Sequence, residues 1–117
     1  MEKYYEKSEK YISKRVFRLT KKEKVKLIDI RSPQEHSLEC IDCAENILVE
    51  HIYDADIKED EVVVLHCQFG GRTNQAASKV AGLNAKNIYL LDGGITAWKQ
   101  HKQPTVKNTK EPLPIMR

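Results

Sequence analysis

Residues 66–73, His-Cys-Gln-Phe-Gly-Gly-Arg-Thr, combine a cysteine with the residue types that would activate it and hold an anion beside it. Two adjacent glycines, Gly70 and Gly71, let the backbone curl so that its amide groups point inward. Arg72 adds a permanent positive charge with forked hydrogen-bond donors. A cysteine at the centre of such a ring is expected to react as a thiolate, so the segment predicts an anion-binding loop with Cys67 as the nucleophile at its base.

The same segment has a simpler interpretation, in which Cys67 is a buried structural residue before an ordinary glycine turn. Four features coincide here: a cysteine at a strand end, two glycines, an arginine five positions after the cysteine, and the start of a helix near Thr73. Such a helix would aim its positive end at the same spot. Because these features rarely coincide by chance, we favour the functional interpretation.

The elements that must position this loop are indicated by apolar runs and turn residues. Residues 25–30, 62–65 and 87–91 predict strands, and the continuously apolar second run is typical of a strand buried on both faces. Helices are predicted after Ser32-Pro33, where Glu35 completes a capping pattern, after the loop, and over residues 8–22 and 95–101. Strands that alternate with helices predict an α/β fold, a parallel sheet with helices on both faces, and ligands beyond its carboxyl edge.

Three segments resemble the motifs of rhodanese-like domains, in the order and spacing of that family. Residues 27–35 resemble the opening motif, residues 67–73 the active-site loop, and residues 91–98 the closing motif. The resemblance covers about residues 25–104 and implies the rhodanese-like α/β fold, with a central, mostly parallel sheet. We therefore expect a rhodanese-like domain over residues 8–104, followed by a polar C-terminal tail over residues 105–117.

The resemblance also implies an activity, in which Cys67 carries sulfur as a persulfide between a donor and an acceptor. Thiosulfate or a protein persulfide is the expected donor, a thiol or cyanide the acceptor, and neither a cofactor nor a metal is expected. Asp29 and Arg31 match the family's Asp-x-Arg and are expected to brace the loop. The loop residues expected to bind substrate are Gln68, Phe69, Gly70, Gly71, Arg72 and Thr73.

Two other functions remain open for such a domain. A Cys-dependent phosphatase or arsenate reductase of related fold has one more residue between cysteine and arginine than the four between Cys67 and Arg72, which makes a wider ring. His66 before the cysteine also occurs in Cys-dependent phosphatases, but the loop length favours sulfur. A rhodanese fold used only for binding or regulation is the second alternative, and the retention of Cys67, Gly70, Gly71 and Arg72 argues against it.

Cys40 and Cys43 mark the main departure from the family pattern, because they replace a histidine and a glycine. The replaced glycine puts the local backbone at Cys43 in question, since cysteine tolerates a positive φ poorly. Their Cys-x-x-Cys spacing leaves three interpretations: a redox pair acting on Cys67, a zinc half-site with His36 one helical turn earlier, or two small loop residues. The last is the simplest, and we expect no metal.

Composition and charge exclude several classes of protein. The chain has 117 residues, 40% of them hydrophobic, and no apolar run longer than four, whereas a membrane span needs about twenty. Three cysteines are too few and odd in number for a disulfide scaffold, so a reducing cytoplasm is expected. Residues 1–26 hold ten Lys/Arg against four Glu, but no zinc-finger spacing or aromatic platform accompanies them, and we predict no nucleic-acid partner.

Overall fold

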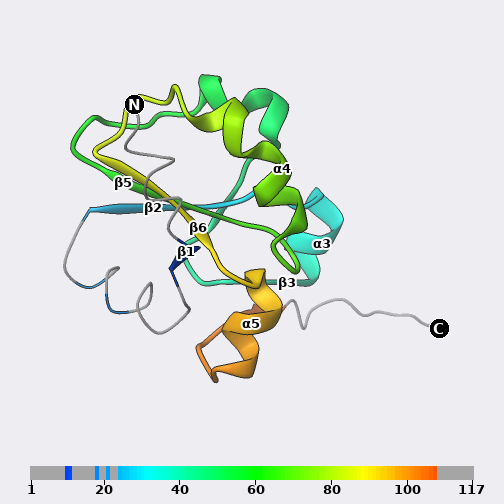
Figure 1. Cartoon of the computed structure of the whole chain (residues 1–117). Helices are drawn as coiled ribbons and strands as arrows, with labels where there is room; N and C mark the ends of the chain where they lie inside the picture. The colour runs from blue at the N-terminus through cyan, green and yellow to red at the C-terminus, as the bar shows by residue number, and fades with distance from the viewer. Residues whose placement is uncertain (1–9, 12–17, 19–20, 22–23, 108–117) are drawn as a thin grey trace.

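The computed structural model describes residues 10–11, 18, 21 and 24–107, and a parallel sheet forms its centre (Figure 1). Within these residues five strands are hydrogen-bonded in the order β1-β6-β5-β2-β4, every pair parallel. The strands are β1 (Lys10–Tyr11), β6 (Asn87–Leu91), β5 (Val62–His66), β2 (Val25–Asp29) and β4 (Glu45–Asn46). A second, two-stranded antiparallel sheet pairs β3 (Glu39–Cys40) with β7 (Val106–Lys107).

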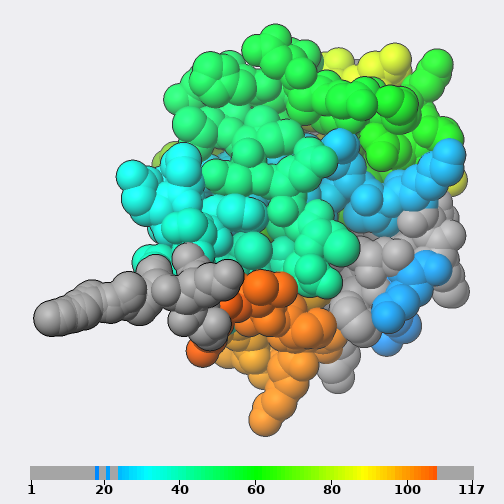
Figure 2. Space-filling model, turned by 180° about the vertical axis from the view of Figure 1, so that it is seen from behind, coloured from blue at the N-terminus to red at the C-terminus, as the bar shows by residue number. Residues whose placement is uncertain are grey.

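Helices cover both faces of the central sheet, as the alternation of strands and helices predicted. The 3₁₀ helix η1 (Val49–Asp54) and α4 (Gly71–Val80) lie together on one face, and α5 (Gly94–Gln100) lies on the other (Figure 1). The short α3 (Pro33–Leu38) follows β2 at the end of the sheet. Figure 2 shows the chain from α3 through η1 running across the back of the molecule, with β7 against it.

Two buried clusters, one on each face, explain why β5 occupies the middle of the sheet. Every residue of β5 is buried, and its side chains alternate between the clusters: Val63 and Leu65 pack on the η1 and α4 side, Val62 and Val64 on the α5 side with Trp98. Successive side chains of a strand point to opposite faces, so the part of β5 that is covered on both faces, Val62 to Leu65, is apolar, and only His66 at its end is polar.

The strands and the capping signal predicted from the sequence are confirmed. Ser32 accepts a hydrogen bond from the Glu35 amide, and the Glu35 carboxylate accepts one from the Ser32 amide, which is the reciprocal capping box. The helix after the loop begins at Gly71, two residues earlier than predicted.

Two segments near the ends of the predicted domain differ from expectation where the structure describes them. Most of the helix predicted over residues 8–22 lies outside the described residues; Lys10–Tyr11 forms β1 instead, because its backbone pairs with β6, while Arg18 and Lys21 are helical. In the predicted tail, Val106–Lys107 forms β7 on Glu39–Cys40, so the folded domain continues past residue 104. The rest of the tail lies outside the described residues.

Candidate active site

Cys67 lies directly after β5, at the carboxyl edge of the sheet, and is almost completely buried. Its Sγ accepts a hydrogen bond from the Gly70 amide at 3.1 Å and lies 4.0 Å from the Thr73 hydroxyl. That hydroxyl in turn donates to the Gly70 carbonyl at 2.9 Å, which ties the loop to the first turn of α4. The backbone amide and the start of α4 therefore both direct positive polarity at the sulfur.

Gly70 is the position that makes this curl possible. It has a φ of +109°, in a region that residues with a Cβ rarely adopt, and it caps α4. Gly71, in contrast, is the first helical residue, and a Cβ there would meet nothing within 4 Å. The expectation that both glycines are needed for the curl is therefore wrong for Gly71, since only Gly70 takes the left-handed conformation.

The closing motif holds the other side of the loop, through residues that were not predicted to belong to the site. Gly94 has a φ of +63°, and a Cβ there would lie 2.5 Å from the carbonyl oxygens of both Cys67 and Gln68. Those carbonyls accept hydrogen bonds from the amides of Ile95, at 3.0 Å, and Thr96, at 3.1 Å. The double glycine after a neighbouring strand was the sequence signal for this packing, because glycine permits close approach of two backbones.

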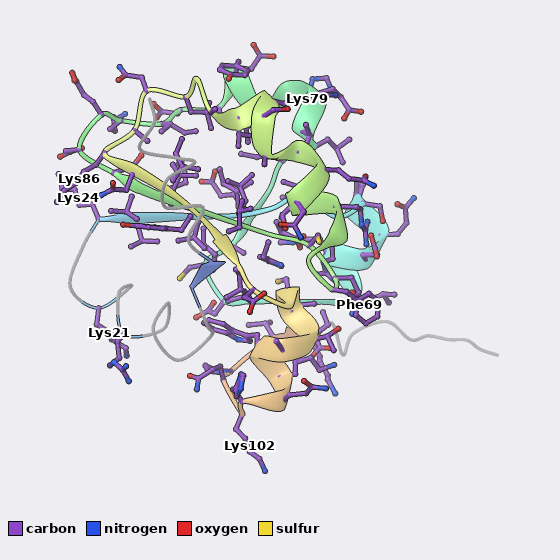
Figure 3. The ribbon with its side chains drawn as sticks, in the orientation of Figure 1. Lys21, Lys24, Phe69, Lys79, Lys86 and Lys102 are labelled. Atoms are coloured by element: carbon purple, nitrogen blue, oxygen red, sulfur yellow. The ribbon has the colours of Figure 1, made fainter. Side chains whose placement is uncertain are left out.

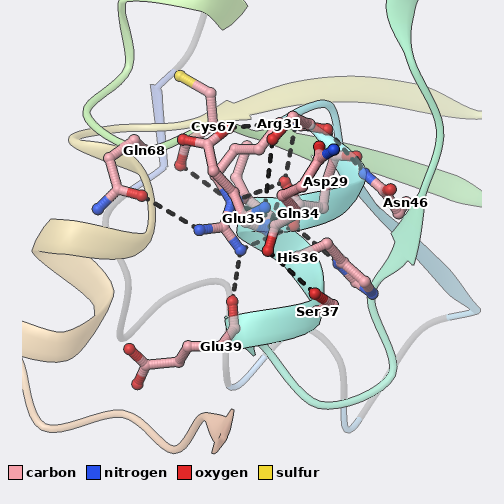
Figure 4. Close-up of polar contacts among 12 residues, drawn as sticks. Asp29, Arg31, Gln34, Glu35, His36, Ser37, Glu39, Asn46, Cys67 and Gln68 are labelled. Atoms are coloured by element: carbon pink, nitrogen blue, oxygen red, sulfur yellow. Dashed lines mark hydrogen bonds and ion pairs between the residues drawn. The ribbon is translucent and has the colours of Figure 1, made fainter. Parts of the chain in front are cut away.

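Asp29 and Arg31 form a buried ion pair beneath the loop (Figure 4). The Asp29 carboxylate accepts hydrogen bonds from Nε and Nη2 of Arg31 at 2.9–3.2 Å. The remaining Arg31 donors reach the Gln68 side chain at 3.1 Å and the Glu39 carbonyl at 2.6 Å. Burial acts to raise the pKa of Asp29, but the Arg31 hydrogen bonds and the nearby His66 and His36 outweigh it, so that pKa is lowered.

Gln68, expected to bind substrate, has its side-chain amide occupied within the protein. Its Oε1 accepts from Arg31, and its Nε2 donates to the Thr96 hydroxyl at 3.1 Å. Gln68 thus joins the opening motif to the closing motif. Phe69 next to it is 71% exposed and points outward at the rim of the loop (Figure 3).

Arg72 reaches Glu35 of α3, with two hydrogen bonds of 2.9 and 3.0 Å to the carboxylate. The sequence pattern indicates Glu35 only as a helix-capping residue, yet its carboxylate also orients the guanidinium of Arg72. The Arg72 hydrogen bonds, followed by the Ser32 backbone, lower the pKa of Glu35 to about 2 despite partial burial. The guanidinium of Arg72 is therefore engaged by the Glu35 carboxylate, and the substrate-binding role of Arg72 stays a prediction.

Two histidines that the sequence pattern does not assign to the site lie against the Cys67 carbonyl or the Asp29 carboxylate. His66 donates from Nδ1 to the Cys67 carbonyl at 3.1 Å, and its buried Nε2 lies 3.9 Å from Asp29 without a hydrogen-bond partner. Burial lowers the pKa of His66, although Asp29 acts in the opposite direction. His36 lies 2.8 Å from the other Asp29 oxygen. In the sequence, the only indication of these contacts is that His66 directly precedes Cys67.

Cys40 and Cys43 are free thiols of different character. Cys43 is exposed and has a φ of +74°, so it adopts the left-handed backbone of the glycine that it replaces. Cys40 is half-buried, and burial raises the pKa of its thiol. The part of the chain that the structure describes contains no group of three or more His, Cys, Asp or Glu suited to a metal ion. His36, the third ligand considered for zinc, binds Asp29 instead.

Comparison with known proteins identifies the class. The Rhodanese-like domain family matches residues 14–101, and the chain belongs to that family. A protein named sulfurtransferase from Allochromatium vinosum is 34% identical over 91 residues, which cover 76% of this chain and 85% of the relative. The fold also superposes on the crystal structure of a rhodanese-related protein from Thermoplasma volcanium, with a TM-score of 0.71, 22% identity, and coverage of 83% of this chain and 96% of that one.

Among longer relatives, an uncharacterized protein of Synechocystis sp. is 33% identical over 101 residues. These residues cover 85% of this chain but only 56% of that relative, so the chain spans little more than half its length. In the described part of this chain, none of the helices is long and apolar enough to cross a membrane.

Proposed function

We propose that the protein is a sulfurtransferase that carries a sulfane sulfur on Cys67. The observation that supports this best is the buried Cys67 thiol, which accepts a hydrogen bond from the Gly70 amide in a loop with four residues between cysteine and arginine. Such preorganised donors stabilise negative charge on sulfur without reorganising during the reaction. The family membership and the relative named sulfurtransferase agree with it.

In the first half-reaction, the Cys67 thiolate attacks the outer sulfur of thiosulfate or of a persulfide donor. A new bond forms between Sγ and that sulfur while the donor's S–S bond breaks, and sulfite or a thiolate leaves with the electron pair. The product is a Cys67 persulfide anion. The Gly70 amide and the start of α4 face that charge, and the Arg72–Glu35 pair lies at the edge of the loop.

In the second half-reaction, an acceptor nucleophile attacks the outer sulfur of the persulfide. The S–S bond to Cys67 breaks, the electron pair returns to Sγ, and the enzyme is again a thiolate. Cyanide would leave as thiocyanate, and a thiol would leave as a persulfide. Asp29 and Arg31 support both steps as positioning residues, since Arg31 holds Gln68 next to the nucleophile.

The alternatives predict different behaviour. A phosphatase or arsenate reductase needs a ring wide enough for a tetrahedral oxyanion, and the short spacing from Cys67 to Arg72 disfavours one. A binding module would not need a nucleophile whose sulfur is hydrogen-bonded by the loop backbone. The three free thiols also suit a reducing, cytoplasmic compartment, which forms part of the proposal.

The test is the intact mass of the protein after brief treatment with thiosulfate, before and after cyanide. One sulfur atom should be added to the wild type and removed by cyanide with formation of thiocyanate. Cys67→Ser should acquire no sulfur, whereas the matched control Cys43→Ser, which removes an exposed thiol, should load like the wild type. The treatment is repeated with a persulfide donor, because a protein that prefers this donor would not acquire sulfur from thiosulfate. Sulfur on Cys67→Ser, or none on the wild type with either donor, would contradict the mechanism.

A further inference from the structure

A pocket of about 250 Å³ between η1 and α4 is not used by the two half-reactions. Its floor is apolar and includes Ile30, Leu48 and Ala76, and its rim carries Glu50 and Lys79. The two helices that form it pack together directly, since the Tyr53 hydroxyl of η1 donates a hydrogen bond of 2.6 Å to the Lys79 carbonyl of α4. The walls of the pocket are therefore held in a defined geometry.

The pocket shares one residue with the loop that follows β5. Arg72, which stands five residues after the nucleophile, also lines the pocket. Ile30 and Ala76 of its floor belong to the buried cluster that contains Cys67. A molecule lying in the pocket would thus have one end beside the loop and the other at Lys79, which Figure 3 shows on α4 near η1.

Charges of opposite sign stand on the two walls without neutralising each other. Glu50 is exposed on η1 and Lys79 is exposed on α4. Within the described residues no ion pair joins them, and neither one has another ion-pair partner. Because Arg72 is already balanced by Glu35, the pocket presents, among the described residues, one anion and one cation without ion-pair partners over an apolar floor. This distribution complements a zwitterion better than a simple anion.

The length of the pocket limits the size of that zwitterion. Arg72 and Lys79 are seven residues apart in α4, which corresponds to about 10 Å at a rise of about 1.5 Å per residue. An extended peptide covers about 3.5 Å per residue, so two or three residues would fill the distance. The volume of about 250 Å³ lies below the range typical of drug-sized ligands, which agrees with such a short peptide.

We propose that this pocket binds the sulfur acceptor, and that the acceptor is a short peptide thiol with free ends. Lys79 binds its carboxylate, Glu50 binds its ammonium group, and its thiol reaches the loop beside Arg72. The assignment rests on the proposed sulfurtransferase function and names its acceptor. The peptide thiolate attacks the outer sulfur of the Cys67 persulfide, the S–S bond to Cys67 breaks, and the peptide leaves as a persulfide.

Binding of unreactive peptides tests this assignment separately from turnover. We would titrate the protein with S-methylated cysteinylglycine, its C-terminal amide and its N-acetyl derivative, following amide NMR shifts. The wild type should bind the free peptide about two- to five-fold more tightly than either derivative, the range expected of exposed ion pairs. Because S-methylation removes the reacting thiol, these dissociation constants do not depend on whether Cys67 transfers sulfur.

Variants assign each end of the peptide to one residue. Lys79→Ala should abolish only the preference over the amide, and Glu50→Gln should abolish only the preference over the N-acetyl peptide. Both side chains are exposed, so neither change should affect folding. The matched control is Lys102→Ala, an exposed lysine at the opposite end of the molecule, which should retain both preferences (Figure 3).

A second readout uses the reactive peptides and the KM of sulfur transfer from loaded Cys67. Lys79→Ala should raise the KM for cysteinylglycine more than that for cyanide, with little change in kcat. Equal affinity of the wild type for the three peptides, or a uniform loss in Lys79→Ala, would overturn the pocket assignment, as would transfer to thiol proteins but not to the peptide. Failure of Cys67 to acquire sulfur, with the peptide preferences intact, would overturn the proposed function and retain a peptide site.

Discussion

The peptide group of Cys67 is held as firmly as its sulfur. The carbonyl accepts hydrogen bonds from His66 Nδ1 and the Ile95 amide, while Sγ accepts one from Gly70. The two hydrogen bonds to the carbonyl fix the peptide plane that leads into the loop, whose Gly70 amide donates to the sulfur. His66 is thus a positioning residue, although its second nitrogen is buried without a hydrogen bond, an arrangement that costs stability of about 1–3 kcal/mol.

Replacing His66 should therefore separate stability from activity. His66→Leu removes both the unpartnered nitrogen and the donor to Cys67, so the protein should stay at least as stable while the rate of sulfur loading falls about five-fold, the equivalent of one neutral hydrogen bond. His66→Asn keeps a donor near the Nδ1 position and should load faster than His66→Leu, although it leaves a cavity and lowers stability. Urea unfolding and loading rates measure the two effects.

The pH dependence of unfolding gives an independent readout of His66. Burial lowers its pKa in the folded state, so its neutral form stabilises the fold fully above the unfolded pKa of about 6.5, and that stability is lost as the pH falls below this value. His66→Leu should remove this part of the pH dependence. If His66→Leu and the wild type lose stability in parallel below pH 6.5, the buried histidine is not responsible.

At the scale of elements, two glycine-containing turns pack the loop between α4 and α5. Gly70 approaches Gly93, and Gly94 lies against the carbonyls of Cys67 and Gln68. The second contact connects α5 to Cys67, although the two lie far apart in the sequence. Parallel strands place both turns at the same edge of the sheet, because β5 and β6 are direct neighbours.

Gly94→Ala should therefore disturb the site from outside the loop. Its Cβ would come within 2.5 Å of two carbonyl oxygens, at a φ that alanine avoids, so we expect a loss of about 2 kcal/mol or more in the free energy of unfolding and impaired loading of Cys67. The control is Gly71→Ala, where nothing lies within 4 Å of the added methyl group and stability should be kept. Thermal unfolding compares the two, and equal stability of both variants would contradict this account.

Over the whole molecule, one carboxylate links the opening motif to the loop. Glu35 caps α3 and binds Arg72, and its pKa of about 2 lies below the ordinary value of 4.5. A carboxyl group with a lowered folded pKa adds stability that is present above about pH 4.5 and is lost as the pH falls toward 2. Acid should thus release Arg72 together with the start of α3.

Glu35→Gln tests that link, because glutamine can keep the capping box but does not titrate. We expect the variant to be less stable at pH 7 by about 0.5–1 kcal/mol, a small value because the pair is partly exposed and screened by solvent. Between pH 4.5 and 2 the variant should lose less stability than the wild type. Urea unfolding over this range measures the difference, and identical acid limbs would argue against the Glu35–Arg72 pair.

By itself the sequence determined β2, β5, β6 and the capped α3, and it led to the proposal of Cys67 as the nucleophile. These depend on local signals: the apolar run of β5, the Ser32-Pro33 helix start, and a cysteine followed by glycines. Only the tertiary structure decided which groups surround Cys67. Gln68 is hydrogen-bonded to Arg31 and Thr96, and Arg72 to Glu35. These contacts depend on strand order and on the packing of distant segments. Hydrogen bonds between side chains far apart in sequence leave no periodic pattern, so they follow from packing alone.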